Sequence, residues 1–261
     1  MFTNHPNLAN IQAYTAVRLG CTIENLQSKE TTIVPAIKPD HPDFMEPYAV
    51  KQADVICVNR LADTTIIRVN QQPSEHVQSV LTKLAVRGND FSETWLMGLE
   101  DVHLHRYFAE PYYYLAPADF KPFTVESTDR QVVVRELNDD DKPQLEALHQ
   151  TLPENMRWFV EIDHPIIFGC FEDDILASVA SHFLFDVGRV AAAGVQTHTD
   201  YRQRGYGKAV VSAVAQWAID HDWTCEWSTW EENPASMALC TALGFREYAV
   251  ETEYRISALK S

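Results

Sequence analysis

The nine glycines of this 261-residue chain are distributed unevenly, and this distribution restricts where unusual backbone turns can occur. Three glycines precede residue 130, and six follow it: Gly169, Gly188, Gly194, Gly205, Gly207 and Gly244. Glycine adopts positive φ angles at little cost and lets another backbone or a ligand come close, so special geometry is concentrated in the second part. We therefore expect the functional site after residue 130.

The second part alternates strand-like and helix-like segments. Runs of β-branched and aromatic residues predict strands at 132–135, 166–171, 175–185, 189–197, 225–230 and 245–256. Apolar side chains at helical spacing predict helices at 140–152, 207–220 and 234–243. Because a short turn joins two of the strands into a hairpin, we expect an α+β domain over residues 128–261, with a mixed, mostly antiparallel sheet flanked by helices.

Residues 1–127 predict a separate N-terminal α+β domain. Helices are expected at 7–19 and 72–87, the second ending before Gly88, and strands at 54–59 and 64–69. A proline-rich, acidic stretch covers residues 35–47, and residues 110–127 are typical of an ordered connector.

Composition and charge exclude several classes of protein. Apolar residues make up 46% of the chain, which is enough for a buried core and argues against disorder. The net charge of −16 argues against nucleic acid and anionic membranes as partners. No apolar run approaches the roughly 18 residues of a membrane helix. Five cysteines without a Cys-x-x-Cys pair favour reduced thiols and a cytoplasmic location.

A glycine-containing loop, Arg202-Gln203-Arg204-Gly205-Tyr206-Gly207, lies between an expected strand and an expected helix. Backbone N–H groups at a helix start lack intrahelical partners, and together with the helix dipole they bind phosphate oxygens. The window around the loop is locally basic, with Asp200 set against Arg189, Arg202, Arg204 and Lys208. The sequence therefore predicts a pyrophosphate-binding loop.

Two common phosphate-binding loops do not fit this segment. A P-loop requires Ser or Thr after Gly-Lys, but Ala209 occupies that position. A dinucleotide-binding fingerprint requires a third glycine or an alanine where Val210 stands, and also a purely parallel setting that the expected hairpin contradicts.

The loop instead resembles the acetyl-CoA loop of the GNAT superfamily of acyltransferases. That pattern is Gln or Arg, two residues, Gly, one residue, then Gly or Ala, and Arg202, Gly205 and Gly207 satisfy it. A second GNAT signature, an Asn before a helix that ends in Gly-Phe, is matched by Asn233 and by Gly244-Phe245. The resemblance covers about residues 130–256 and implies acetyl-CoA as the cosubstrate.

The resemblance also implies which residues bind acetyl-CoA. The pantetheine arm would pair with the edge of strand 189–197, where this strand and strand 225–230 splay apart. The pyrophosphate would meet the loop, and the start of helix 234–243 would line the same cleft. The implied binding residues are Val195, Gln196, Thr197, Arg202, Gln203, Arg204, Gly205, Tyr206, Gly207, Lys208, Asn233 and Ser236.

GNAT chemistry is a direct attack of an amine on the thioester, which needs an oxyanion donor and an acid for the leaving thiolate. A backbone N–H near Val195 or Thr197 is the expected donor. The family often has Tyr where this chain has Cys240, so the candidate acids are Cys240, Tyr248 and Tyr254.

The general base is absent from its most familiar position, because Ala191, Ala192 and Ala193 stand where the family often has a carboxylate. Glu226 on the neighbouring strand, His182 on the preceding one, or a water chain to either remain as alternatives. His103 and His105 have no companion ligands at suitable spacing, so no metal is expected.

Our leading hypothesis is an acetyl-CoA-dependent N-acetyltransferase acting on a small, cationic amine. The rival is a catalytically silent acetyl-CoA-binding sensor or assembly module. The N-terminal domain is either unrelated or a degenerate acyltransferase-like half, which would give the fold internal pseudo-symmetry. The acceptor, read by the N-terminal part and by residues 153–164, is not identified, and a homodimer is an open alternative to a monomer.

Overall fold

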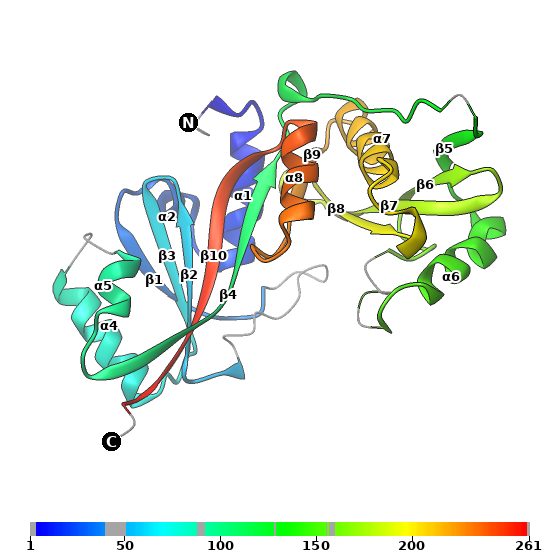
Figure 1. Cartoon of the computed structure of the whole chain (residues 1–261). Coiled ribbons are helices and arrows are strands. Elements are labelled where there is room, and N and C mark those ends of the chain that lie inside the picture. The colour runs from blue at the N-terminus through cyan, green and yellow to red at the C-terminus, as the bar shows by residue number, and fades with distance from the viewer. Residues whose placement is uncertain are drawn as a thin grey trace. The chain divides into compact units, whose positions relative to one another are not determined.

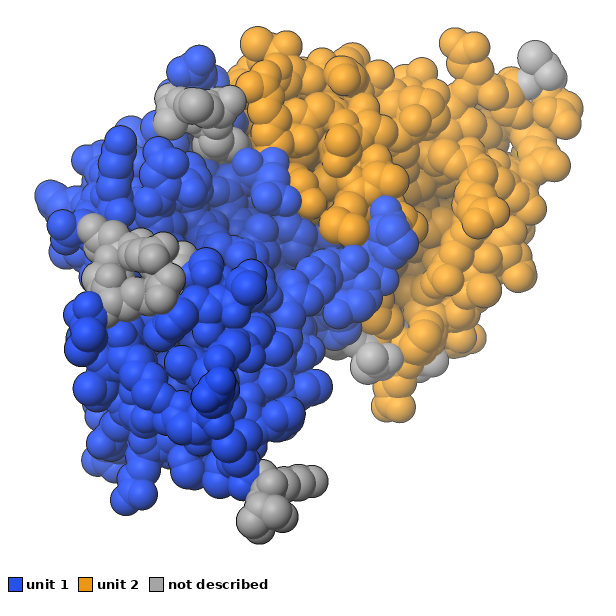
Figure 2. Space-filling model, turned by 60° about the vertical axis from the view of Figure 1, so that its left-hand side comes forward, with its two compact units in different colours: residues 1–112, 229–234, 247–261 blue, residues 113–228, 235–246 orange. Residues whose placement is uncertain are grey.

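The computed structural model of the chain (Figure 1) describes residues 4–39, 51–87, 92–127, 129–154, 156 and 160–259. It divides into two compact units, coloured separately in Figure 2. Unit 1 consists of residues 1–112, 229–234 and 247–261, and unit 2 consists of residues 113–228 and 235–246. Both units thus draw on segments before and after residue 127. The division at residues 127 and 128, and the acyltransferase-like origin of the first part, stay predictions.

Unit 1 is built around the strand order β1-β3-β2-β10-β4. Strand β1 is parallel to β3, whereas β2 is antiparallel to both β3 and β10. Its elements are α1 (Leu8–Leu19), α2 (Ile23–Gln27), β1 (Thr31–Pro35), β2 (Val55–Leu61), β3 (Thr64–Val69), α4 (Glu75–Arg87), α5 (Glu93–Met97), most of β4 (Val102–Tyr114) and most of β10 (Arg246–Ala258).

Helices cover both faces of the unit 1 sheet (Figure 1). One apolar cluster joins α4 and α5 to alternate residues of the strands, among them Ile56, Ile67 and Tyr254. A second cluster joins α1 and α2 to the opposite face, where Ile66 and Ala249 lie. This arrangement follows from the alternation of side chains along each strand, which gives a sheet with two buried faces.

Unit 2 has the strand order β9-β8-β7-β6-β5. Neighbouring strands from β5 to β8 are antiparallel, and β8 and β9 are parallel. Its elements are β5 (Val132–Glu136), α6 (Lys142–Gln150), β6 (Ile166–Glu172), β7 (Ile175–Phe185), β8 (Val190–Thr197), α7 (Tyr206–Asp220), β9 (Thr224–Ser228) and most of α8 (Pro234–Leu243). The predicted fold class, α+β with a mixed, mostly antiparallel sheet flanked by helices, is confirmed.

Helices α7 and α6 cover opposite faces of the unit 2 sheet (Figure 1). On the α7 face, Val210 and Val214 pack against strand residues such as Ala180. On the α6 face, Leu145 and Val179 belong to a second cluster. Consecutive residues such as Val179 and Ala180 therefore pack in different apolar clusters, on opposite faces of the sheet. This alternation determines which side chains lie on the same face as a given site.

Two strands are missing from the sequence prediction, β1 and β4. Strand β4 runs through Pro111, inside the segment that the sequence indicates as a connector. Proline has no N–H for a ladder hydrogen bond, so its presence argues against a strand. Strand β1 likewise ends in a proline, Pro35. Gly88 and residues 40–47 of the proline-rich stretch lie outside the described residues. Among those described, no helix combines the length and apolar character needed to cross a membrane.

Candidate active site

The loop between β8 and α7 places a helix start against the end of a strand. Gly205 is the N-cap of α7 and has a left-handed backbone with φ of 86°, and Gln203 also has a positive φ of 63°. Glycine offers no side chain to cap the first N–H groups of the helix, so these groups remain suited to an external acceptor. A Cβ on Gly207 would lie 3.0 Å from Oγ1 of Thr197, so glycine permits this close approach.

The basic residues near this loop differ in their surroundings. Arg204 forms an ion pair with Glu172 at 3.3 Å, and Arg130 forms another at 2.9 Å. The Tyr206 hydroxyl also donates to Glu172, and this hydrogen bond, followed by the two arginines, holds the pKa of the carboxyl below its usual value. Arg202 is exposed, and Lys208 lies over the Phe123 ring, 3.5 Å from its centroid.

The expectation that Arg189 adds to the basic window is wrong. Its guanidinium donates to the backbone oxygens of His221 and Asp222, at 2.9 and 3.2 Å, just beyond the C-terminal end of α7. The loop lies at the opposite end of this 15-residue helix, so about 20 Å of helix separates Arg189 from it. The position of Arg189 near the loop in the sequence does not indicate at which end of α7 its side chain lies.

Strands β8 and β9 pair over only a short distance. Their parallel register joins Val190 to Thr224, Ala191 to Cys225 and Ala192 to Glu226 and stops there, although β8 continues to residue 197 alongside β7. In residues 193–197, the backbone N–H and C=O groups that point away from β7 therefore have no β9 ladder beside them. Among the described residues, no β9 ladder therefore covers this edge of β8 directly before the loop that begins α7.

Glu226 lies at the point where the pairing stops. It is 3% exposed, and the hydroxyl of the fully buried Tyr114 donates a hydrogen bond to its carboxylate. Tyr114 is held beside β9 by the next residue, because the Leu115 N–H donates to the Cys225 oxygen at 3.1 Å. The sequence indicates Glu226 as a candidate base, but its only indication of Tyr114 is a run of three consecutive tyrosines.

The three side chains predicted as candidate acids pack against apolar clusters. Cys240 belongs to the unit 2 core, its Sγ lies 3.2 Å from the Met237 oxygen, and burial raises the pKa of its thiol to about 11. Tyr248 packs in unit 1 beside Cys21, and burial raises the pKa of its phenol to about 12. Tyr254 is 1% exposed in the other unit 1 core, and burial raises its pKa.

His182 also has a core environment. It is fully buried on the α7 face, and its Nε2 lies 2.7 Å from the Val214 oxygen in α7. Burial lowers the pKa of the imidazole to about 4. His182 and Glu226 therefore lie on opposite faces of the sheet, since Val214 and Cys225 share the α7 core and Glu226 is the next residue on β9.

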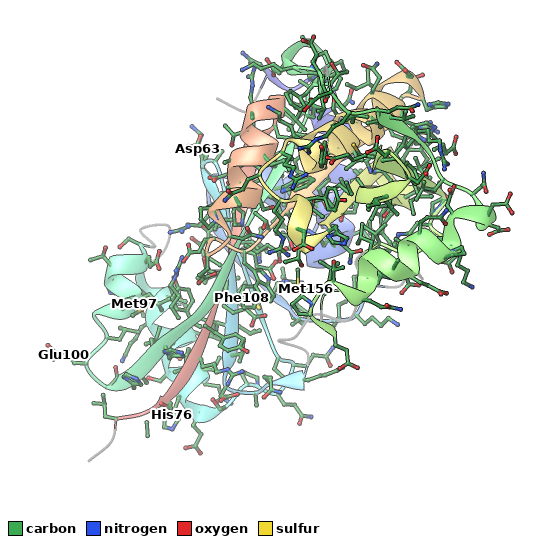
Figure 3. All side chains as sticks on the ribbon, turned by 45° about the vertical axis from the view of Figure 1, so that its right-hand side comes forward. Asp63, His76, Met97, Glu100, Phe108 and Met156 are labelled. Atoms are coloured by element: carbon green, nitrogen blue, oxygen red, sulfur yellow. The ribbon has the colours of Figure 1, made fainter. Side chains whose placement is uncertain are left out.

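The remaining predicted binding residues divide between the two faces of β8. Gln196 turns toward α6, where its Oε1 lies 2.9 Å from Nε2 of His149 and its amide donates to the oxygen of Met156, labelled in Figure 3. Val195 packs on the α7 core. At the start of α8, Asn233 is exposed, whereas Ser236 accepts a hydrogen bond from the Trp227 indole at 3.1 Å. Whether these residues bind acetyl-CoA stays a prediction.

One group of described residues in unit 1 has side-chain atoms close enough to hold a metal ion. The ligand atoms of Cys57, Glu251 and Glu253 lie within 4.8 Å of one another in a buried cluster. Glu251, however, already forms ion pairs with Arg68 at 2.7 Å and Arg18 at 3.3 Å, and these cations oppose a further positive charge. The absence of a metal in the function stays a prediction.

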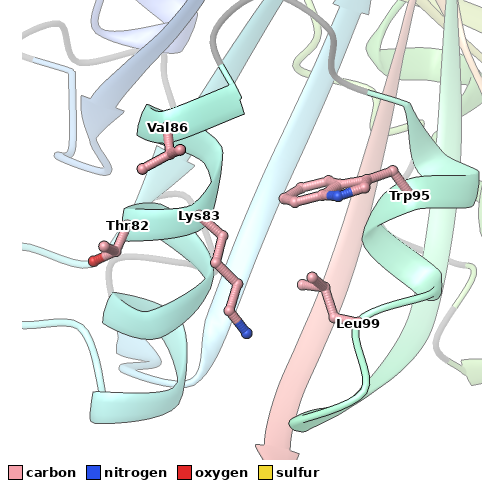
Figure 4. A pocket seen from close by; sticks show the side chains of 5 residues that line it. All are labelled: Thr82, Lys83, Val86, Trp95 and Leu99. Atoms are coloured by element: carbon pink, nitrogen blue, oxygen red, sulfur yellow. The ribbon is translucent and has the colours of Figure 1, made fainter.

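A hollow of about 470 Å³ lies between α4 and the segment around α5. Its lining residues, shown in Figure 4, are Thr82, Lys83, Val86, Trp95 and Leu99. The Lys83 ammonium is paired with Asp101, so the hollow presents mostly apolar surface and no group suited to acid–base chemistry.

Most of this geometry lies in a segment of the chain that matches a known protein family. Residues 132–245 match the family model described as "Acetyltransferase (GNAT) family". No curated protein matches the chain. Among solved structures, the chain is similar to a putative GNAT acetyltransferase from Novosphingobium aromaticivorans, with 20% identity, coverage of 62% of this chain and 69% of that one, and a TM-score of 0.43.

Two further structures are similar. A GNAT acetyltransferase from Colwellia psychrerythraea shares 15% identity, with coverage of 73% and 76% and a TM-score of 0.46. An aminoglycoside N-acetyltransferase in complex with CoA shares 21% identity, with coverage of 47% of this chain and 93% of that one and a TM-score of 0.39. Residues 132–245 thus match the GNAT acetyltransferase family, and the predicted resemblance, enzyme class and acetyl-CoA cosubstrate are confirmed at the level of that family.

Proposed function

We propose that the chain transfers the acetyl group of acetyl-CoA to the amine of a small, cationic substrate by direct attack. The observation that carries this proposal is the early end of β8–β9 pairing at Ala192 and Glu226, directly before an uncapped helix start. An extended thioester arm can pair with an open strand edge, and a pyrophosphate can bind helix N–H groups, so the two features together match one elongated, anionic ligand.

The arm of acetyl-CoA pairs with β8 at residues 195–197, and the pyrophosphate binds at residues 203–208. Arg202 and Lys208 supply positive charge there, because Arg204 is already paired with Glu172 and Arg189 lies at the far end of α7. This places the acetyl group near the point where β8 and β9 stop pairing. The carboxylate nearest to that point on the strands is Glu226.

Glu226 acts as the general base in this proposal. The Tyr114 hydroxyl donates a hydrogen bond to its carboxylate and thereby orients it. The amine nitrogen attacks the thioester carbon, a backbone N–H of β8 stabilises the oxyanion, and the C–S bond breaks. Glu226 accepts one proton from the ammonium group before the attack, and the second proton lost by the nitrogen passes to the CoA thiolate, which leaves as the thiol as the amide product forms. Cys240 has no part in this step, because its thiol packs in the core.

The overall charge supports a cationic acceptor. With a net charge of −16, the protein has an electrostatic field that attracts ammonium groups and repels anions. The anionic pyrophosphate is the exception, because the loop binds it locally. The KM for the amine is then expected to rise with ionic strength, because salt screens this attraction.

The test combines acetyl-CoA binding with turnover. Isothermal titration calorimetry measures acetyl-CoA binding to the full chain, and release of free CoA thiol measures turnover with a panel of amines. Glu226→Gln is expected to lower kcat/KM by about 10²-fold or more at neutral pH without changing the Kd of acetyl-CoA. Glu232→Gln, an exposed carboxylate near the start of α8, serves as the control.

The outcomes separate the competing functions. No binding of acetyl-CoA contradicts both the enzyme and the rival sensor or assembly module. Binding without thiol release across the panel contradicts the enzyme and favours the module, which the core position of Cys240 and the three alanines of β8 would then explain. Equal activity of Glu226→Gln and the control contradicts the assignment of the base alone.

A further inference from the structure

Strand β5 ends the strand order of unit 2, and among the described residues no strand pairs with its outer edge. On its inner edge, the Leu137 N–H, directly after β5, donates to the Ile167 oxygen of β6 at 3.0 Å. Successive residues of a strand direct their backbone groups to opposite edges, so the N–H and C=O groups of Val132, Val134 and Glu136 point outward. Such an edge is a template for a further strand.

The centre of this edge is apolar. Val133 is 38% exposed and Val134 is 36% exposed, and both are β-branched residues, which favour strand pairing. Natural proteins protect a free edge with a lysine, a proline or another charged side chain, but residues 132–134 contain none of these. The centre of β5 therefore lacks the features that prevent pairing with another chain.

The strand at the other end of the described strand order, β1, differs in this respect. The Ala36 N–H donates inward to the Val69 oxygen at 2.6 Å, so the nitrogen of Pro35 faces outward, and proline has no N–H to donate. The exposed Ile33 of β1 is the outward position before this blocked one. Of these two end strands, β5 is the one suited to accept a further strand.

The charges along β5 indicate which strand fits its edge. Val132 packs on the α7 face, and the neighbouring Arg130 reaches the same face, where it forms its ion pair with Glu172. Glu136 follows on this face at the other end of β5. The edge therefore has a positive end, an apolar centre at Val132 and Val134, and a negative end. The Arg130 side chain is 44% exposed while it is paired, so its guanidinium can contact a further carboxylate.

A second copy of β5 in antiparallel orientation satisfies this pattern. With Val132 of each copy opposite Val134 of the other, each Arg130 faces the Glu136 of the other copy. Both valine pairs then consist of outward-pointing residues, which can exchange N–H···O hydrogen bonds. Parallel pairing in register would instead place Arg130 beside Arg130 and Glu136 beside Glu136, which is unfavourable.

The same register fits the α6 face of the sheet. It places Val133 opposite Val133 of the second copy, on a two-fold axis, and Arg135 opposite Gln131. Arg135 already forms an ion pair with Asp141 at 2.6 Å, and Gln131 carries no charge. No like charges meet on this face, so the register is acceptable on both sides of the sheet.

We infer that two copies of this chain associate through β5, as antiparallel neighbours that continue the unit 2 sheet across a two-fold axis. The occupant is a second copy because the apolar centre and the oppositely charged ends of the edge are complementary to themselves. The inference goes beyond the proposed function and does not depend on acetyl transfer. A strand of five residues is smaller than a standard interface of about 20–30 residues a side, so we expect a weak dimer with a Kd of about 1–100 μM.

Sedimentation velocity of the full chain between about 1 and 200 μM tests the association. The net charge of −16 opposes it at long range, so the buffer contains about 0.15 M salt, which screens charges more than about 8 Å apart. Val133→Lys should raise the dimer Kd about tenfold or more, because it places two ammonium groups opposite each other on the axis. Ile33→Lys, the same change at an exposed residue of β1, is the matched control and should leave the Kd unchanged.

Exchanging charges tests the orientation of the two strands. Glu136→Arg should raise the Kd several-fold, because Arg130 of the other copy then faces a like charge. Mixing Glu136→Arg with Arg130→Glu should restore association between the two variants, since each altered end then faces an opposite charge. The Tm of every variant is measured alongside, so that a loss of folding is distinguished from a loss of association.

Disulfide cross-linking tests the register. In the proposed pairing, Val133 and its counterpart form a pair without hydrogen bonds, with Cα atoms about 4.5 Å apart, which suits a disulfide. Val133→Cys should therefore cross-link on mild oxidation. Val134→Cys should not, because its counterpart lies diagonally at about 7–8 Å. The unaltered chain, oxidised in parallel, gives the background from its own five cysteines.

Several results would overturn the inference. These are a monomer over the whole concentration range, a dimer whose Kd Val133→Lys leaves unchanged, and a dimer that Ile33→Lys dissociates. If Val133→Lys does not fold, the mixing experiment and the cross-linking decide in its place. Failure of the mixed variants to associate excludes the antiparallel orientation, and cross-linking of Val134→Cys in place of Val133→Cys excludes the register. Acetyl-CoA binding and turnover have no part in these measurements, so the proposed function can fail separately.

Discussion

The buried carboxyl of Glu253 makes the stability of unit 1 depend on pH. Glu253 lies on β10 and is 3% exposed; the Cys57 thiol donates to its Oε1 at 3.4 Å, and its Oε2 has no partner among the described residues. Burial is the main reason why its pKa rises from 4.5 to about 7; Glu251 raises it further, while Cys57, Arg68 and Arg255 lower it. The folded unit therefore binds this proton more tightly than the unfolded chain does.

The sign and size of the effect follow from linkage. Below a pH of about 4.5 both states are protonated, and the stabilising contribution of the protonated carboxyl is complete. As the pH rises from about 4.5 to about 7, Glu253 loses its proton in the unfolded chain but keeps it in the folded unit, and the stabilising contribution of the protonated carboxyl is lost. A pKa difference between 4.5 and about 7 corresponds to at most about 3 kcal/mol at about 1.4 kcal/mol per pH unit. Above pH 7 Glu253 adds no further pH dependence.

Glu253→Gln removes this titration. We expect the free energy of unfolding of the wild type, relative to that of the variant, to fall by up to about 3 kcal/mol between pH 4.5 and pH 8. Urea denaturation followed by tryptophan fluorescence measures it, and hydrogen exchange in β10 and β2 assigns it to unit 1. Glu247→Gln, an exposed glutamate of the same strand, is the control. Parallel pH profiles for wild type and Glu253→Gln would refute the reasoning.

Three further predictions concern unit 2. Gly244→Ala should lower the stability of unit 2 by about 3 kcal/mol or more, measured as a lower Tm, because a Cβ there would overlap the Asp119 oxygen and the φ of 101° disfavours a side chain. Lys208→Ala should weaken acetyl-CoA binding several-fold in calorimetry, whereas Arg189→Ala, at the other end of α7, should leave it unchanged. Cys240→Ala should leave the pH profile of kcat unchanged and lower Tm, because Cys240 packs in the core rather than donating a proton.

Local patterns predicted most of unit 2. The helix 234–243 has the predicted ends, and α7 begins one residue earlier than predicted, because Pro234, Gly205 and Gly244 mark helix ends through their own backbone preferences. The hairpin of β6 and β7 was equally accessible, since its signal is contained in about twenty consecutive residues. The sequence therefore sufficed wherever a turn and the segments it joins lie next to each other along the chain.

Contacts between distant segments could not be predicted in this way. Tyr114 and Glu226 are 112 residues apart, and nothing near Tyr114 indicates that β4 ends beside β9. Arg189 shows the converse, because a residue near the loop in sequence donates instead to the far end of α7. In both cases the decisive information is strand order and helix direction, which hydrophobic periodicity does not contain.

The strand register changes how the three alanines of β8 are interpreted. In the sequence, the position where the family often has a carboxylate is occupied by Ala191, Ala192 and Ala193, and this favours a catalytically silent module. In the structure, Ala192 lies directly beside Glu226, so a carboxylate is present in the same row but comes from β9. Under the proposed function, β9 therefore supplies the base that β8 lacks, and the three alanines of β8 do not by themselves favour a silent module.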